Sequence, residues 1–130
     1  MEYQAKAKYL RISTRKVRLV ADAIRPLSVE RALQQLSIMS KRAGSFLKKV
    51  IDSAVANAKV KNGKEVSNLR FARIDVSEGP SMKRWHAVSK GTAHAYKKRM
   101  THIKVVLTDD VKDTKKMSTK GWKITNGTKN

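Results

Sequence analysis

The sequence predicts an α+β fold: three helices packed on a small three-stranded antiparallel sheet, with a long projecting β-hairpin and a basic C-terminal tail. Apolar residues recur at helical spacing through much of the first half of the chain. They recur with a period of two in one segment before the helices and in two segments after them. The last two segments flank a stretch, within Gly79–Leu107, that has no Asp or Glu and too few apolar residues to form a core.

The length of 130 residues is typical of one domain. We expect a single nucleic-acid-binding α+β domain at residues 1–110, which includes the extended hairpin at 79–103. The remaining residues, 111–130, are rich in Lys, Thr and Asn and show little periodicity. They are expected to form a basic tail that is flexible unless it meets a polyanion.

Charge is the strongest compositional signal. The chain has 30 Lys and Arg residues against 10 Asp and Glu residues, for a formal net charge of +20. Charge repulsion on this scale weakens a compact state unless a polyanion neutralises it. Such a basic excess is typical of nucleic-acid binding.

The composition also indicates the cellular compartment. The chain has no cysteine, which excludes disulfides and thiolate metal sites and fits a reducing compartment. No apolar run is long enough to span a bilayer, and the first residues lack the layout of a secretory or transit signal. We therefore expect a cytoplasmic protein without a membrane partner.

The first strand is expected at residues 3–10, where Tyr3, Ala5, Ala7 and Tyr9 alternate with polar residues that give the other face a cationic character. The first helix follows Ser13 or Thr14, either of which can cap it.

Breaker residues mark the later helix ends. Pro26 ends the first helix, Ser28 caps the second, and Asn62–Gly63 ends the third. The apolar stripes of these helices indicate core positions.

One face of the first helix carries three cations and one acid. Arg15, Arg18, Asp22 and Arg25 line this face, with Arg11 and Lys16 nearby. The row is either a solvated surface or a phosphate-contacting face, and the overall charge favours the second interpretation.

The two later strands are expected to form the hairpin. Ala72, Ile74 and Val76 alternate with polar residues, as do Ile103, Val105 and Leu107. A two-residue turn at Lys90–Gly91 is the best in this stretch, because Gly supplies a positive φ. It places these pairs opposite each other: Trp85 and Tyr96, Val76 and Val105, and Ile74 and Leu107. At about 3.3 Å per residue, the hairpin would reach roughly 35–40 Å from Gly79.

Both legs of the hairpin carry groups that bind nucleic acid. The cations are Lys83, Arg84, Lys90, Lys97, Lys98, Arg99 and Lys104. Arg grips phosphate with paired hydrogen bonds, whereas Lys acts as a point charge. Trp85 and Tyr96 either stack on bases, at about 1–3 kcal/mol each, or pack on each other and stiffen the hairpin.

The sequence offers no reaction site. His86, His94 and His102 are eight residues apart, which fits no compact metal-ligand pattern, and phosphate-facing histidines are the better interpretation. Asp109–Asp110 is the only adjacent acidic pair and indicates a solvated strand end more than a magnesium site. We expect no catalytic residue, no metal and no cofactor.

Four segments together resemble a known family. "RISTRKVRLVADAIR", "KKVIDSAVANA", "DVSEGPSMKR" and "HIKVVL" follow the order and spacing of bacterial-type large-subunit ribosomal protein twenty-two. The resemblance covers about residues 5–108. It implies a structural constituent of the large ribosomal subunit that organises rRNA during assembly, with its hairpin lining the nascent-peptide exit tunnel.

The resemblance also implies a set of binding residues. By position, the rRNA-facing residues are Lys8, Arg11, Arg15, Lys16, Arg18, Lys83, Arg84, Lys97, Lys98 and Arg99. The charge pattern adds Arg25, Lys90 and His102. The tunnel-facing tip would be His86, Ala87, Val88, Ser89, Lys90, Gly91, Thr92, Ala93 and His94. The family's tip usually carries Pro-Arg and further Arg residues, so this tip is expected to be less cationic and less rigid.

The implied partners are large-subunit rRNA, neighbouring large-subunit proteins near the tunnel and the nascent polypeptide that passes the tip. No homo-oligomer is expected. The ribosome would be of bacterial type, whether in the cytoplasm or in an organelle that encodes its own copy.

Two other functions fit parts of the pattern. A DNA-bending architectural protein also combines a helical body with basic β-ribbon arms, but such proteins normally dimerise. An RNA-processing enzyme would need carboxylates or histidines that converge on one site. Preference for folded rRNA over duplex DNA would argue against the DNA-bending protein. RNA cleavage that is lost on mutation of Asp109 and Asp110 would support the enzyme.

Overall fold

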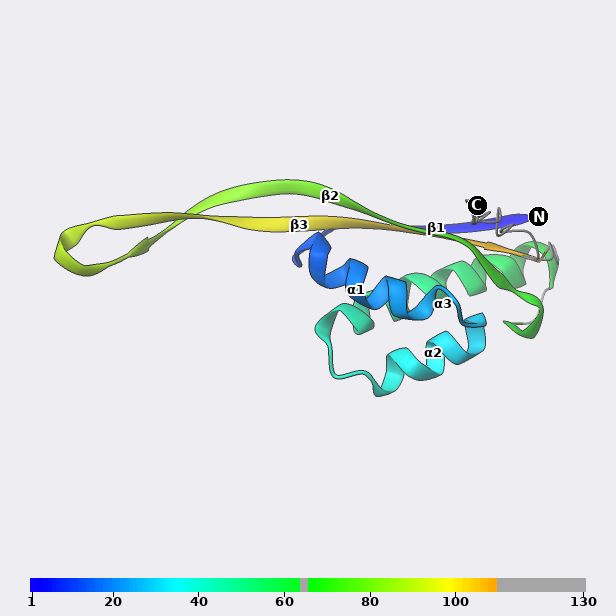
Figure 1. The fold of residues 1–130 in the computed structure, drawn as a ribbon. Coiled ribbons are helices and arrows are strands. Elements are labelled where there is room, and N and C mark those ends of the chain that lie inside the picture. Colours follow the sequence, from blue (N-terminus) through cyan, green and yellow to red (C-terminus); the bar gives the residue numbers. More distant parts are fainter. Residues whose placement is uncertain (64–65, 110–130) are drawn as a thin grey trace, which may run out of the picture.

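The computed structural model describes residues 1–63 and 66–109; the predicted tail at 111–130 lies outside the described residues. Within them, three helices cover one face of a three-stranded antiparallel sheet, as predicted, and the strands lie in the order β1-β3-β2. Two of its strands continue far beyond the helices as a twisted hairpin (Figure 1). The elements are β1 (Glu2–Leu10), α1 (Thr14–Ile24), α2 (Val29–Ile38), α3 (Arg42–Asn62), the 3₁₀ turn η1 (Val66–Asn68), β2 (Arg70–Ala87), the 3₁₀ turn η2 (Ser89–Gly91) and β3 (Ala93–Thr108).

The core lies between the helices and one face of the sheet. The central strand β3 contributes Ile103, Val105 and Leu107, which are almost completely buried. The helix α3 brings Leu47 and Ile51 against this layer, both with no exposed surface. Small residues farther along α3, such as Ala54 and Ala58, are also fully buried and allow the helix to approach the sheet closely. The helical stripes identified in the sequence therefore are core, as predicted.

The predicted helix ends are confirmed. Ser13 and Ser28 occupy the N-cap positions of α1 and α2, although neither side chain makes a capping hydrogen bond. The third helix ends at Gly63, which adopts the left-handed conformation with φ of 60° and donates its N–H to Lys59 O at 2.9 Å. The first helix ends at Ile24, two residues before Pro26.

The predicted hairpin register is wrong, and the turn is the first reason. The hairpin closes through three residues, Ser89–Gly91, and not through a two-residue turn. Lys90 and Gly91 both have positive φ angles, of 60° and 70°, and Val88 N–H donates to Thr92 O at 2.9 Å outside the turn. The additional loop residue shifts all pairs by one, so that Trp85 lies opposite Ala95.

Two bulges shift the register further. Gly79 and Pro80 together lie opposite Met100, because the pairing is interrupted between Glu78 and Ser81. Pro80 has no N–H to donate to the ladder, which suits it to a bulge. As a result Val76 pairs with Ile103 instead of Val105.

The second bulge lies between Phe71 and Arg73. It turns Ala72 to the solvent, whereas the alternation placed it on the core face. Phe71 packs against the core in its place. Below, "arm" means residues 81–99 and "body" means the other described residues.

Candidate nucleic-acid interface

The arm has no packing partner within the part of the chain that the structure describes. Every residue from Ser81 to Arg99 is exposed, whereas burial resumes at Met100. The arm contains six Lys and Arg residues and no Asp or Glu. A surface of this kind is suited to a polyanion that approaches both legs of the hairpin.

The register sorts the arm's side chains onto two faces. Arg84 pairs with Tyr96, His86 with His94, and Met82 with Lys98, so these six residues share one face. His86 and Tyr96 stack at 4.2 Å between ring centroids, with an interplanar angle of 10°. The ring of Tyr96 is thus already covered on one side by an aromatic neighbour.

Trp85 lies on the opposite face. Of the two alternatives for these rings, the packing of Trp85 on Tyr96 is therefore wrong, because adjacent strand residues point to opposite sides of a sheet. Trp85 faces Ala95, and 62% of its surface is exposed. Lys83 and Lys97, a cross-strand pair, lie on the same face as Trp85. This face therefore offers an uncovered indole beside two cations, which is the combination that single-stranded nucleic acid binds.

The tip contains Lys90 as its one cation between His86 and His94. Lys90 adopts a left-handed backbone conformation, which is uncommon for a residue with a side chain. The turn is held by Thr92 Oγ1, which donates to Ser89 O at 2.9 Å. Val88 remains 44% exposed. The tip thus presents one charge among small and apolar groups.

The predicted arginine face of α1 divides into two groups. Arg11, Arg15 and Lys16 are exposed to solvent. Arg18 and Arg25 are exposed as well, but they also reach the neighbouring strand, where they donate to Val76 O and Ile74 O. The charge pattern in the sequence predicted one role for both groups, and an RNA contact by all five residues remains a prediction.

The uncovered face of the sheet carries two cations, Lys6 and Arg73, that the predicted set did not include. Lys6, Lys104 and Asp75 form one row across the three strands. Arg73 lies nearby and forms an ion pair with Asp75 at 2.9 Å between Nε and Oδ2. The polar alternation in β1 was visible in the sequence, but the strand order that joins these residues into one surface was not.

His102 has a partner within the chain. Its Nδ1 accepts the backbone N–H of Tyr9 at 3.0 Å, and the two rings meet edge to face at 4.8 Å. Tyr9 has a φ of 58°, so the bond holds a strained position at the bulge of β1. An rRNA contact by His102 would have to use the remaining side of the ring.

The described residues hold no arrangement that indicates catalysis or metal binding. No three His, Asp or Glu residues among them are grouped to hold a metal ion. Asp109 forms an ion pair with the N-terminal amine of Met1. None of the helices in residues 1–63 and 66–109 has the length and apolar character needed to cross a membrane.

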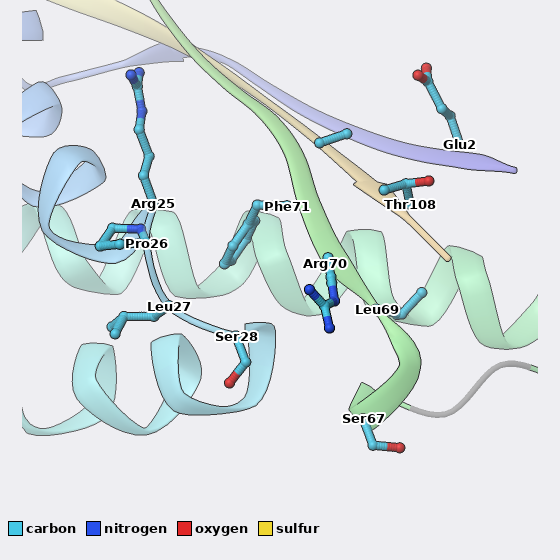
Figure 2. A pocket seen from close by; sticks show the side chains of 11 residues that line it. Glu2, Arg25, Pro26, Leu27, Ser28, Ser67, Leu69, Arg70, Phe71 and Thr108 are labelled. Carbon is cyan, nitrogen blue, oxygen red and sulfur yellow. The ribbon is translucent and has the colours of Figure 1, made fainter. Parts of the chain in front are cut away.

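A cavity of about 710 Å³ opens beside the connection from α1 to α2 (Figure 2). Leu69 and Phe71 form part of its wall, and Arg70 and Ser28 lie at its margin. Glu2 is the one carboxylate among its lining residues, which include no histidine. The lining therefore does not provide the paired acid and base that a hydrolytic site requires.

Comparison with protein families gives one match. The family model described as Ribosomal protein L22p/L17e matches residues 5–108, which is most of the chain. Among the described elements, the matched segment includes the three helices, β2, β3 with the entire arm, and β1 from Ala5 onward. This result favours a ribosomal function over the DNA-bending alternative.

Proposed function

We propose, because the chain belongs to the family of ribosomal protein L22p/L17e, that its arm lines the nascent-peptide exit tunnel of a bacterial-type large ribosomal subunit. Members of this family are structural components of the large subunit that bind rRNA and serve translation, and they are not known as enzymes. The tunnel position, the bacterial type and the part played in rRNA assembly are the proposed refinements.

One observation carries the proposal: the arm is exposed over its full length and has no acidic residue. An isolated two-stranded hairpin is at best marginally stable in water, so an arm of this length needs a partner along its sides. RNA supplies that partner, because its phosphates neutralise the six cations and its bases offer surfaces to Trp85. A carboxylate in the arm would face phosphate and be repelled.

The body and the arm would then have different tasks. Arg11, Arg15 and Lys16 on α1, together with Lys8, would bind rRNA near the tunnel exit and hold the body there. Arg18, Arg25 and His102 stay in the proposed rRNA-facing set, although each has a partner within the chain. Neighbouring large-subunit proteins would contact the body, and the ribosome would be in the cytoplasm or in an organelle.

The arm would run along rRNA inside the subunit through both legs, with Lys83 and Arg84 on one and Lys97, Lys98 and Arg99 on the other. Lys104 would add a cation on the uncovered face of the sheet in the body. The tip, His86–His94, would meet the nascent polypeptide.

Photo-crosslinking tests the tunnel position. A photoreactive amino acid is placed at Lys90 in the tip, and the matched control is Asp52, which is exposed on α3 in the body. Ribosomes that contain either variant are stalled on a labelled nascent chain and irradiated. We expect an adduct with the nascent chain from position 90 and none from position 52.

One result would contradict the proposed tunnel position. If the position-90 variant enters large subunits yet forms no adduct with nascent chains of any length, the arm does not line the tunnel. Co-sedimentation of both variants with large subunits in moderate salt verifies that they are incorporated.

A further inference from the structure

We infer that α1 and the segment before it form a collar that fixes the direction of the arm, and that Arg18 is a positioning residue within this collar. The collar consists of Ile12, Thr14, Arg18 and Arg25, which contact both legs of the hairpin where it leaves the body. The functional consequence rests on the proposed function, since an arm that enters a tunnel must leave the body at a defined angle.

The first leg is held through its backbone. Arg18 donates from Nε and Nη2 to Val76 O, at 3.3 and 3.1 Å, and Arg25 donates from Nη2 to Ile74 O at 3.0 Å. The strand β2 lies at the edge of the sheet, so backbone groups on its outer side have no strand partner. Hydrogen bonds from a charged donor are roughly twice as strong as neutral ones. Two arginines of one helix therefore attach that helix to the edge of the first leg.

The second leg is held through a buried hydroxyl. Thr101 has no exposed surface, and its Oγ1 donates to Ile12 O at 2.7 Å. The same oxygen lies 3.4 Å from Oγ1 of Thr14, the first residue of α1. Thr101 pairs with Glu78 on β2, two residues after Val76. The collar thus contacts both legs at nearly the same level.

The root of the arm lies directly beyond these contacts. Gly79 and Pro80 form the bulge opposite Met100, which is only 7% exposed. A Cβ atom at Gly79 would lie 3.1 Å from the backbone carbon of Met100, so the two legs are in close contact here. After the bulge, no residue of the arm is buried. Nothing in the body beyond this level can therefore steer the arm.

Small changes at the root are amplified at the tip. At about 3.3 Å per residue, the tip lies about 30 Å beyond the bulge, so that a tilt of about 10° moves it by about 5 Å. A displacement of that size would change which groups the tip meets. Because the collar belongs to the same helix as Arg15 and Lys16, rRNA that binds this helix would also set the aim of the arm.

Arg15 provides a matched control for Arg18. Both arginines are exposed and lie one turn apart on α1, but Arg15 makes no hydrogen bond to the strand within the described residues. Only Arg18 therefore orients the arm, whereas both side chains can reach phosphate. Loss of Arg18 should change the direction of the arm, and loss of Arg15 should not.

Pulsed electron paramagnetic resonance on the isolated full chain tests this difference. The chain has no cysteine, so cysteines introduced at Lys97, just beyond the root, and at Asp52 on α3 carry the only spin labels. We expect Arg18→Gln and Thr101→Val each to broaden or shift the distance distribution between the labels. Arg15→Gln should leave the distribution unchanged. Arg18→Lys should change it less than Arg18→Gln does, since Lys retains one charged donor.

The salt dependence of binding to large-subunit rRNA gives the second measurement. Arg15→Gln should lower the slope of log K against log[salt] by about 0.7–0.9, as expected for one lost phosphate contact, and Thr101→Val, which removes no charge, should leave it unchanged. The inference is overturned if Arg18→Gln and Thr101→Val leave the distances unchanged, or if Arg15→Gln changes the distances as Arg18→Gln does. Circular dichroism checks that each variant folds, and Thr101→Val tests the collar should Arg18→Gln fail to fold.

The result is independent of the tunnel position. The distances are measured without ribosomes, so a collar that orients the arm and a tip that forms no nascent-chain adduct would together refute only the proposed function.

Discussion

The body and the arm use the same two strands, β2 and β3, in two different environments. In the body, Ile74, Val105 and Leu107 lie under the helices and are buried. In the arm, the same ladder continues through pairs such as Lys83 and Lys97, but every side chain is exposed. The backbone pairing is common to both regions, and only what covers the side chains differs. The arm is therefore a strand pair that no second layer covers within the described residues.

Removing the arm tests this comparison most severely. Replacing residues 81–99 by Asn-Gly should leave a folded body, because no core residue is lost. Binding to large-subunit rRNA should weaken strongly. If all six deleted cations contact phosphates, the slope of log K against log[salt] should fall by as much as about 5. Circular dichroism and binding titrations at several salt concentrations provide the measurements.

The comparison would fail if the shortened chain did not fold, since the arm would then contribute to the core. An unchanged slope would instead show that the six cations do not contact RNA.

A substitution in the core should lower the stability of the fold, whereas a matched substitution in the arm should not. Leu47 in α3 has no exposed surface, so Leu47→Ala should lower the free energy of unfolding by about 2–5 kcal/mol. The matched change in the arm is Val88→Ala, which should alter it by no more than about 0.5 kcal/mol. Urea denaturation followed by circular dichroism measures both. Equal effects of the two changes would contradict the division between body and arm.

The boundary between the two regions should be sensitive to one methyl group. Gly79→Ala places a Cβ atom 3.1–3.2 Å from Met100, and we expect a loss of about 1–3 kcal/mol in the free energy of unfolding. Gly91→Ala is the contrast: no atom lies within 4 Å, and its cost of about 1 kcal/mol would come from the positive φ. Thermal or urea unfolding measures both. A neutral Gly79→Ala would mean that the legs can separate at the root.

Sequence periodicity was sufficient to predict the helices, the strands and the arm, because each depends on local pattern. The stop at Gly63 depends on one residue that tolerates a positive φ. The register was not predictable in the same way. Shifts by two residues keep the same faces matched, and each bulge or additional turn residue changes the pairing without changing the apolar pattern.

The candidate site, like the register, could be predicted from the sequence only in part. Arg15 and Arg18 are equivalent in the sequence, since helical spacing places both on one face of α1. Only the position of β2 beside that helix separates them, and that position follows from the packing of distant segments. For the same reason Lys6 and Arg73, which are far apart in the sequence, were not grouped with Lys104.

The smallest expected effect concerns the cations of the body alone. Arg15→Gln and Lys16→Gln should each lower the salt slope of rRNA binding by about 0.7–0.9 and change the free energy of unfolding by no more than about 0.5 kcal/mol. Both side chains are exposed, so their replacement removes charge without opening the core. Glu30→Gln on α2 is the control, because it removes an exposed acid and should not lower the slope. If both cation variants bind rRNA with the unaltered slope, Arg15 and Lys16 do not contact phosphate, and other cations would carry the electrostatic part of binding.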